Sequence, residues 1–438
     1  MTFHRRDAET QRIIPSPRRG EGREGGTGIA FSRRSFLRSS ASLLASAAGV
    51  PLFLHRASAL AAESGKRGKV LVVLFLRGAV DSLNVLVPFR EPFYKKARPG
   101  IALLEPSGKE GRPLDLDGTF ALHPELKNLL PLYKAGNLAF VRGVGLPRVQ
   151  RSHFDAQDFM ETGTPGLKST QEGWLARALN SIPGPLVHPQ AVALSRNLPR
   201  ILRGAEGAVS FPQPESFDFR GQQARDRAAP AFHQMYQGSE DPLLGPAAAE
   251  LFDSLEAVRA MEADGSDEKG KIAKGKIEYG NPLKDAARLI KELPGLRVLF
   301  AEAGGWDHHA GETSRMNLGL SRLGPSLSSF AADLGDLLQD VVLVTLTEFG
   351  RTVRENGSGG TDHGYGGFSM VLGGSVRGGK LYGEFRGLDP ELLFEGRDLP
   401  VTVDFRQVLH EVLIAHLGIK DTRSIFPGFV AAPSLGIL

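Results

Sequence analysis

Residues whose side chains could take part in catalysis or metal binding gather in one stretch of the second half of the chain. The stretch begins with the apolar run Val341–Leu346, which is rich in β-branched residues and typical of a strand buried on both faces of a parallel sheet. Glu348 and Arg351 follow directly, and a glycine-rich loop then delivers Asp362 and His363. Open α/β sheets bind ligands at the carboxyl ends of their strands. An Asp-His pair among glycines has little packing value, so we predict metal binding or acid–base chemistry here.

Two other predicted strands also end in acidic residues. Lys69–Leu76 leads through a glycine turn to Asp81, and Arg297–Ala301 leads through two glycines to a D-H-H cluster that contains Asp307 and His309. In an extended loop Asp307 and His309 would lie on the same side, because side chains alternate. Asp81 taken alone is better explained as the cap of a following helix. The recurrence of acids at strand ends favours a shared site.

A further strand, Leu138–Arg142, precedes the segment Arg151-Ser152-His153. Ser152 is a candidate helix cap and also a candidate hydroxyl nucleophile, which metal coordination could activate. His153 on a packed helix face would more often be a hydrogen-bonded core residue than a ligand. The segment therefore offers a nucleophile and one further nitrogen donor.

The collected candidates form an oxygen and nitrogen ligand set without sulfur. The candidate metal ligands are Asp81, Asp307, His309, Glu348, Asp362 and His363, with His153 and His308 as additional candidates. Such sets suit Zn²⁺, Mn²⁺ or iron, or with fewer histidines Mg²⁺ and Ca²⁺. Arg77, Arg151 and Arg351 stand beside candidate ligands and could hold phosphate or sulfate oxygens. The alternative is that these arginines pair with the acids and that no metal binds.

The composition narrows the class of protein. The chain has 438 residues, 41% of them hydrophobic, which suffices for one large or two ordinary domains. Residues 1–61 contain 10 lysines and arginines against 4 acids, whereas the remainder contains 43 against 45. The positive charge thus belongs to the amino-terminal segment, and the rest shows no basic surplus for nucleic acid. The absence of cysteine excludes disulfides and thiolate ligands.

The amino-terminal segment looks like an export signal. Residues 1–31 are polar and aperiodic, and we expect them to be disordered. The run S-R-R-S-F-L, with Arg33 and Arg34, precedes an apolar stretch from Ser40 to Leu54 and a small-residue cleavage site. This pattern resembles a bacterial twin-arginine signal. The alternative, a membrane span, needs about 20 apolar residues. We therefore expect recognition by the twin-arginine export machinery, a periplasmic or cell-envelope location, and membrane contact only through an uncleaved signal.

The apolar periodicity of residues 62–438 predicts an α/β protein. A three-layer α/β/α arrangement with a mostly parallel central sheet follows from strands that alternate with helices. Residues 62–438 are expected to form one domain, with an excursion or cap around 196–282 and a loop over 91–120. Besides the strands above, we predict strands at Gln190–Leu194 and Ser369–Leu372 and helices at Pro124–Lys134, Trp174–Leu179, Pro246–Met261, Leu283–Leu293, Leu318–Gln339 and Val408–Leu417.

Several segments together resemble a known bacterial family. They read LFLRGAVDSLNVLVPF (74–89), LHPEL (122–126), RSHFDAQDFMETG (151–163), GGWDHH (304–309), TEFGRT (347–352), GTDHGYGG (360–367) and VDFRQVLHEVLIAHLG (403–418). With the twin-arginine leader, they resemble the family catalogued as domain of unknown function 1501. That family is placed in the alkaline-phosphatase-like superfamily, with sulfatases and cofactor-independent phosphoglycerate mutases. The resemblance implies an alkaline-phosphatase-like fold.

The same resemblance implies roles for individual residues. Asp81 would bind one metal ion, Asp307 with His309 would bind the other, and His363 would arrive from a loop. Ser152 would be the nucleophile. The superfamily usually carries an Asp-His pair where this chain has Glu348 and Phe349, so one ligand is missing.

The function expected from this resemblance is an exported hydrolase of phosphate or sulfate esters. The substrate would be small or polymeric, and the cofactor would be one or two divalent ions, Zn²⁺ or Mn²⁺. Two alternatives stay open: a non-catalytic envelope protein that binds a polymer or a protein partner on the same scaffold, and a phosphoryl or sulfuryl transferase.

Overall fold

A computed structural model describes residues 68–183, 190–205, 208–212, 281–293 and 295–438. The chain divides into two units, Met1–Leu43 and Leu44–Leu438, and the described residues all belong to the second. The predicted leader, the predicted helix Pro246–Met261 and most of the 196–282 excursion lie outside the described residues. Within the described ranges, no helix has the length and apolarity to cross a membrane.

A nine-stranded sheet forms the centre of the fold. Its strands are β1 (Val70–Leu76), β5 (Leu138–Gly145), β6 (Ala191–Leu194), β7 (Ala208–Ser210), β8 (Val298–Ala303), β9 (Val341–Leu346), β10 (Gly367–Gly373), β11 (Leu381–Tyr382) and β12 (Val403–Asp404). They run in the order β11-β5-β10-β9-β1-β8-β6-β7, with β12 also paired to β5. Only β10 is antiparallel to its neighbours β5 and β9; every other pair is parallel. The prediction of a mostly parallel sheet is confirmed.

This topology gathers four loops at one edge of the sheet. The carboxyl ends of β1, β5, β8 and β9 meet there, because these strands point the same way. Strand β10 runs in reverse, so its first residue lies at this edge as well. The loop 347–366, which joins β9 to β10, therefore starts and finishes beside the residues that follow the other strands.

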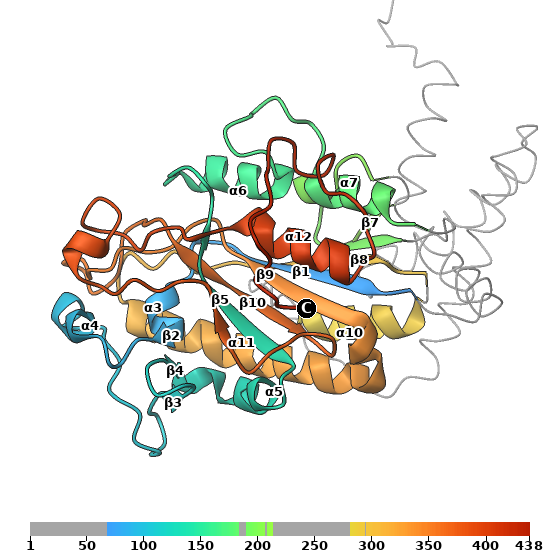
Figure 1. Cartoon of the computed structure of the whole chain (residues 1–438). Coiled ribbons are helices and arrows are strands. Elements are labelled where there is room, and N and C mark those ends of the chain that lie inside the picture. Colours follow the sequence, from blue (N-terminus) through green and yellow to red (C-terminus); the bar gives the residue numbers. More distant parts are fainter. Residues whose placement is uncertain (1–67, 184–189, 206–207, 213–280, 294) are drawn as a thin grey trace, which may run out of the picture. The chain divides into compact units, whose positions relative to one another are not determined.

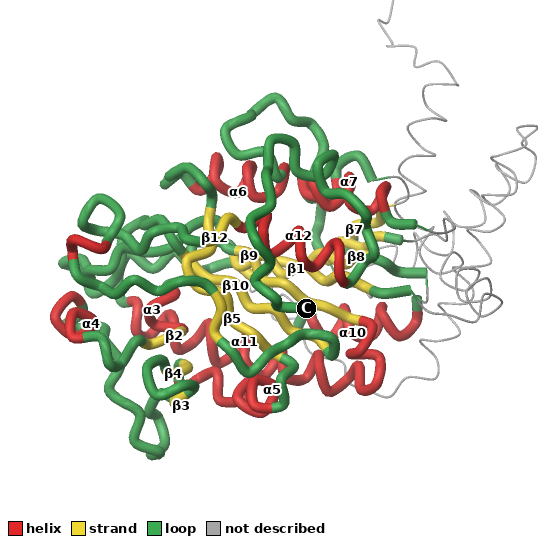
Figure 2. The backbone as a smooth tube through the Cα atoms, viewed as in Figure 1, coloured by secondary structure: helices red, strands yellow, loops and turns green. Residues whose placement is uncertain are grey.

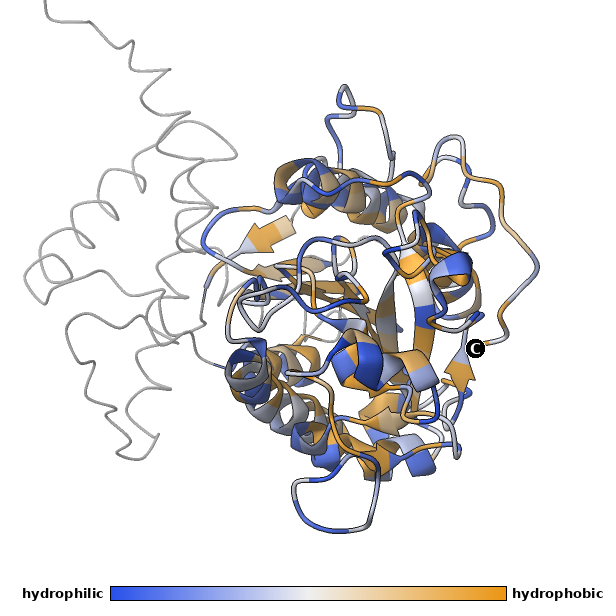
Figure 3. Ribbon diagram, turned by 90° about the vertical axis from the view of Figure 1, so that its left-hand side faces the viewer, coloured by the Kyte–Doolittle hydropathy of each residue, from blue (hydrophilic) through white to orange (hydrophobic). Residues whose placement is uncertain are grey.

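Helices cover both faces of the sheet (Figures 1 and 2). On one face are α6 (His153–Thr162), α7 (Trp174–Ser181) and α12 (Phe405–Ala415); on the other are α5 (Leu130–Lys134), α10 (Pro282–Glu292) and α11 (Glu312–Leu334). Strand β1 shows why. Its alternate residues Leu71, Val73 and Phe75 enter the core beneath α6, α7 and α12, while Val70 and Val72 enter the core with α10 and α11. A strand buried on both faces must be apolar throughout, and Figure 3 shows the sheet strands as mainly hydrophobic.

The shorter elements correct part of the sequence interpretation. The segment 91–120, expected to be a loop, contains α4 (Pro92–Ala97) and β3 (Leu114–Asp115). Glu91 caps α4 and Pro92 starts it, but six residues are too few for a detectable helical period. The other short elements among the described residues are α3 (Ser82–Val85), β2 (Leu86–Val87), β4 (Ala121–Leu122) and the 3₁₀ segments η1 (Pro124–Leu129), η2 (Arg200–Leu202), η4 (Gly335–Asp340) and η5 (Pro390–Leu392). Strands β2, β4 and β3 pair as a small second sheet.

Candidate metal centre

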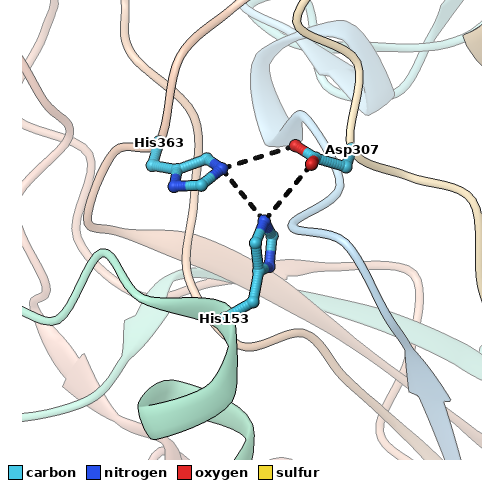
Figure 4. Close-up of side chains that lie close together, drawn as sticks. All are labelled: His153, Asp307 and His363. Atoms are coloured by element: carbon cyan, nitrogen blue, oxygen red, sulfur yellow. Dashed lines mark hydrogen bonds and ion pairs between the residues drawn. The ribbon is translucent and has the colours of Figure 1, made fainter.

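Three ligand atoms converge at the carboxyl edge of the sheet (Figure 4). His153 is the first residue of α6, Asp307 lies in the loop after β8, and His363 lies in the loop before β10. The two Nε2 atoms are 2.9 Å apart, His153 Nε2 is 3.5 Å from Asp307 Oδ2, and His363 Nε2 is 3.4 Å from Asp307 Oδ1. Ligands about 2.0–2.1 Å from a tetrahedral zinc ion are roughly 3.3 Å from one another. The triangle therefore has the size that one such ion needs.

A third histidine joins this triangle from one side. The Nε2 atom of His309 lies 2.9 Å from His363 Nε2 and 3.1 Å from Asp307 Oδ1. Asp307 and His309 thus face the same point, as the alternation along an extended loop predicts. His309 Nδ1 is 3.0 Å from Asp362 Oδ1. The structure brings together four of the predicted site residues, Asp307, His309, Asp362 and His363, with His153 as the fifth member.

Every histidine of the centre has its Nδ1 atom next to an acceptor. His153 Nδ1 contacts Glu348 Oε1 at 2.7 Å, and His363 Nδ1 contacts the carbonyl oxygen of Arg151 at 2.8 Å. An ionised carboxylate or a carbonyl only accepts, so each Nδ1 carries the hydrogen and each Nε2 of a neutral ring presents a lone pair. Lone pairs that face one another at 2.9 Å repel. Either extra protons or a metal cation must therefore lie between these atoms.

Glu348 supports His153 from behind. Its buried carboxylate accepts hydrogen bonds from the backbone N–H groups of Gly78 and Ala79 and from Gln157 Nε2, at 2.8, 3.2 and 2.8 Å. Burial raises the pKa of Glu348, but hydrogen bonds from His153 and Gln157 outweigh it, so the pKa lies below its ordinary value. A carboxylate behind a ligating imidazole fixes its tautomer and orientation. The predicted ligand Glu348 is therefore placed one layer behind the converging atoms.

Arg351 holds Asp307 in place. This wholly buried side chain donates to Asp307 Oδ1 at 2.6 Å and to the carbonyl oxygens of Ala79 and Thr361 at 2.7 and 3.0 Å. Burial raises the pKa of Asp307, yet the hydrogen bond and charge of Arg351 outweigh it and the net pKa is lowered. Asp307 is thus ionised and oriented, while Arg351 is turned away from solvent.

The histidine pKa values move in opposite directions. The hydrogen bond that His153 donates to Glu348 raises the pKa of His153, and the charges of Glu348 and Asp307 add to this effect against burial. Burial lowers the pKa of His363, and the positive charge of Arg351 adds to that effect. The hydrogen bonds of His309 and Asn356 lower the pKa of Asp362. As pH falls, the Nε2 atom of His363 therefore stays unprotonated to a lower pH than the Nε2 atom of His153.

Two predicted ligands lie elsewhere. Both carboxylate oxygens of Asp81 bond the buried guanidinium of Arg98, and Asp81 also caps α3 through the N–H of Leu83. The buried ring of His308 is bonded to the carbonyl oxygen of Gly305 at 2.8 Å. Neither side chain belongs to the converging set, so we leave Asp81 and His308 out of the proposed ligands.

The remaining candidates have defined surroundings. Arg77 bonds Glu302 and Glu161 at 2.6 and 2.8 Å, and Arg151 bonds Glu395 and Asp398 at 2.7 Å each. Ser152 occupies the predicted cap position of α6, but its exposed side chain makes no capping hydrogen bond. The serine hydroxyl immediately precedes His153 in the chain and is not committed to the helix.

Sequence reasoning missed residues that position the centre. Gln157, one helical turn after His153, bonds Glu348; the i, i+4 spacing from His153 would have found it. Phe349 packs its ring 4.8 Å from that of His153 and 4.9 Å from that of His363, centroid to centroid. Arg98 follows α4 in the segment expected to be a loop, and no local pattern marks it.

The fold and the centre define a class: an α/β protein with a mostly parallel sheet and a candidate metal centre at its carboxyl edge. Residues 68–426 match the family described as protein of unknown function DUF1501, and the chain belongs to that family, as the sequence resemblance predicted. No curated protein matches the chain.

Solved structures of low identity also match. The PsFucS1 sulfatase from Pseudoalteromonas sp. is 10% identical over 88% of this chain and 74% of its own, with a TM-score of 0.37. The Thermus thermophilus alkaline phosphatase is 16% identical over 69% and 61%, with a TM-score of 0.30. The lipoteichoic acid synthase LtaP from Listeria monocytogenes is 10% identical over 78% and 76%, with a TM-score of 0.33.

Proposed function

We propose that this chain is an exported hydrolase that uses a single Zn²⁺ or Mn²⁺ ion. The observation that carries the proposal is the convergence of three histidine Nε2 atoms and one aspartate, with each Nδ1 anchored on an acceptor. His153, Asp307 and His363 would be the principal ligands, with His309 completing the set. Export rests on the S-R-R-S-F-L leader and would need the twin-arginine machinery.

One ion, and not two, fits the surroundings. Glu348 is already satisfied by backbone N–H groups and Gln157, and Asp81 is satisfied by Arg98. Phe349 offers no ligand atom and packs against His153 and His363. The residues that the resemblance assigned to a second ion are therefore engaged in holding the protein together.

The expected reaction is hydrolysis of a phosphate or sulfate ester. A bound divalent ion lowers the pKa of a water molecule and polarises the ester oxygens. Overall, the water oxygen joins phosphorus or sulfur, the bond to the ester oxygen breaks, and the leaving alcohol takes the proton. Ser152, exposed beside His153, is the residue proposed to attack first and to pass the group on to water.

Metal content tests the proposal. The chain exported through its own signal would be compared with the double variant His309→Ala, His363→Ala by inductively coupled plasma mass spectrometry. We expect one equivalent of Zn²⁺ or Mn²⁺ in the native chain and none in the variant. A native chain that is folded but free of metal would rule the hydrolase proposal out.

Ser152→Ala separates two routes of hydrolysis. If the hydroxyl is the nucleophile, turnover of phosphate and sulfate esters should fall by several orders of magnitude, as for other nucleophile deletions. Metal content should stay at one equivalent, because the Ser152 hydroxyl is not among the ligands. Full turnover in the variant would show that water attacks directly.

A second candidate function is a non-catalytic envelope protein that binds a polymer or a partner. It is favoured by the internal ion pairs of Arg77, Arg151 and Arg351, the last of which is wholly buried. Turnover of any ester by the metal-loaded chain, lost in the double variant, would exclude it.

A further inference from the structure

We infer that the reacting group of the substrate carries one negative charge, as in a sulfate monoester or a phosphodiester, and not the two of a phosphate monoester. The inference rests on the proposed function and narrows its substrate class. It follows from the partners of the arginines around the centre.

Arg351 is closed to a ligand. Its side chain has no exposed surface, and its donors are taken by Asp307 and by the carbonyl oxygens of Ala79, Thr361 and Trp306. Its charge serves to offset that of Asp307, so it contributes no surplus positive charge toward a substrate.

Arg151 and Arg397 share one buried acid. Arg151 Nη2 lies 2.7 Å from Asp398 Oδ2, and Arg397 Nε lies 2.9 Å from Asp398 Oδ1. Arg151 also pairs with Glu395 at 2.7 Å, and Arg397 donates to the carbonyl oxygen of His363 at 2.6 Å. These two cations thus brace the segment that carries His363, and two carboxylates balance them.

Two carboxylates pair with the single positive charge of Arg77. It pairs with Glu302 at 2.6 Å and with Glu161 at 2.8 Å, while its third contact is Gln157. Two acids against one arginine leave this side of the centre negative.

The charges therefore do not favour a dianion. The acids in the centre or paired to its arginines are Glu161, Glu302, Asp307, Glu348, Asp362, Glu395 and Asp398, and the arginines are Arg77, Arg151, Arg351 and Arg397. A divalent ion brings two positive charges against an excess of three negative ones. Sites that recognise phosphate dianions present guanidinium groups that can fork onto two oxygens. A phosphate monoester is a dianion above its second pKa of about 6. At pH 8 it therefore brings two negative charges into these negative surroundings, whereas a monoanion brings one.

Binding of two matched ligands tests this without turnover. The zinc-loaded chain would be titrated at pH 8 by calorimetry with phenylphosphonate, a dianion, and with its monomethyl ester, a monoanion. We expect the monoester anion to bind at least tenfold more tightly. Tighter binding of the dianion would overturn the inference and leave the proposed function in place.

A single substitution should shift this preference. Glu395→Gln removes one of the two carboxylates on Arg151, and its exposed position keeps the change at the surface. We expect the affinity for phenylphosphonate to rise severalfold relative to its methyl ester. The matched control Glu105→Gln, which removes an equal charge from the exposed pair with Lys95, should change neither affinity. Equal shifts in both variants would contradict a local origin.

Hydrolysis distinguishes the two sources of a monoanion. Turnover of 4-nitrophenyl sulfate would identify a sulfate monoester site, and turnover of methyl 4-nitrophenyl phosphate a phosphodiester site; either result supports the inference. A chain without bound metal that hydrolyses neither ester would overturn the proposed function, and the inference with it.

Discussion

Two clusters of charged side chains follow strands of the same sheet, and the carboxylates in the two clusters have different partners. After β1, Asp81 meets Arg98, and both side chains are almost wholly buried. Glu312, beside them, bonds Asn84 and Thr361 at 3.1 and 2.6 Å. After β8, Asp307 lies beside histidine Nε2 atoms that face one another at 2.9 Å. The first cluster is satisfied by protein groups alone, whereas the second requires extra protons or a metal cation between its nitrogens.

The comparison shows that an acid at the end of a strand is not a site by itself. Asp81 and Asp307 start from the same local pattern, a buried strand followed by glycine. Asp81 becomes structural because Arg98 reaches it from the segment after α4, with its remaining donors on the carbonyl oxygens of Thr352 and Val353. Asp307 keeps nearly half of its side chain exposed. Arg351, which is also buried, bonds only Oδ1 of Asp307, whereas Arg98 bonds both carboxylate oxygens of Asp81. A buried cation that takes both oxygens thus separates a scaffold residue from a ligand.

Removing Arg98, the cation of the first cluster, should have the largest effect on the free energy of unfolding. Arg98→Ala leaves Asp81 buried and unpaired, and breaking a buried ion pair in this way costs about 3–5 kcal/mol of unfolding free energy. Urea denaturation of the metal-free chain would measure it. Lys95→Ala, which breaks an exposed pair, should leave the midpoint almost unchanged. Equal stability of Arg98→Ala and native chain would show that the first cluster is not a scaffold.

The supports of the second cluster should have a smaller effect, on metal affinity. Glu348→Gln and Asp362→Asn keep the shape of the side chain and weaken its hold on His153 or His309. Partners behind ligands typically change metal affinity by about 10–100-fold. Competition with a chromophoric chelator would measure it, with Glu302→Gln as the control. An unchanged metal affinity in both variants would show that the carboxylates at the Nδ1 atoms of His153 and His309 do not support metal binding.

The first cluster should also make stability depend on pH. Burial and the charge of Asp81 raise the pKa of Glu312 to about 9, so the folded chain keeps this proton while the unfolded chain loses it near pH 4.5. Between these values the unfolded state binds fewer protons, and stability falls as pH rises. Glu312→Gln should flatten the decline in unfolding free energy from pH 5 to pH 9. A slope as steep as that of the native chain would contradict a protonated Glu312.

Local sequence predicted the scaffold of the site well. The apolar runs at 69–76, 297–301 and 341–346 are strands in the structure, because a strand buried on both faces must be continuously hydrophobic. The residues that follow them could be assigned to one edge, since parallel strands end together. Asp307, His309 and His363 were identified on that basis, and the structure brings them together.

Pairing between distant segments could not be predicted in the same way. Arg98 meets an acid 17 residues away, Arg351 one 44 residues away, and Arg151 one 247 residues away. No local period encodes these contacts. Arg77, Arg151 and Arg351 were therefore considered for substrate binding, with pairing to acids as the alternative, and the structure shows acid partners for all three. Glu348 was expected to be a ligand, and its carboxylate is engaged by protein groups. His153 was a secondary candidate because a histidine on a helix is usually a core residue.

Anomalous diffraction from crystals of this chain, grown with Zn²⁺ and measured at the zinc edge, tests the central claim most directly. The account predicts one peak at the carboxyl edge of the sheet, within about 2.0–2.2 Å of His153 Nε2, His363 Nε2 and an Asp307 oxygen. Asp81 should stay bonded to Arg98. A peak bound to Asp81 or Glu348, a second peak beside the first, or no peak at the three ligands would contradict it.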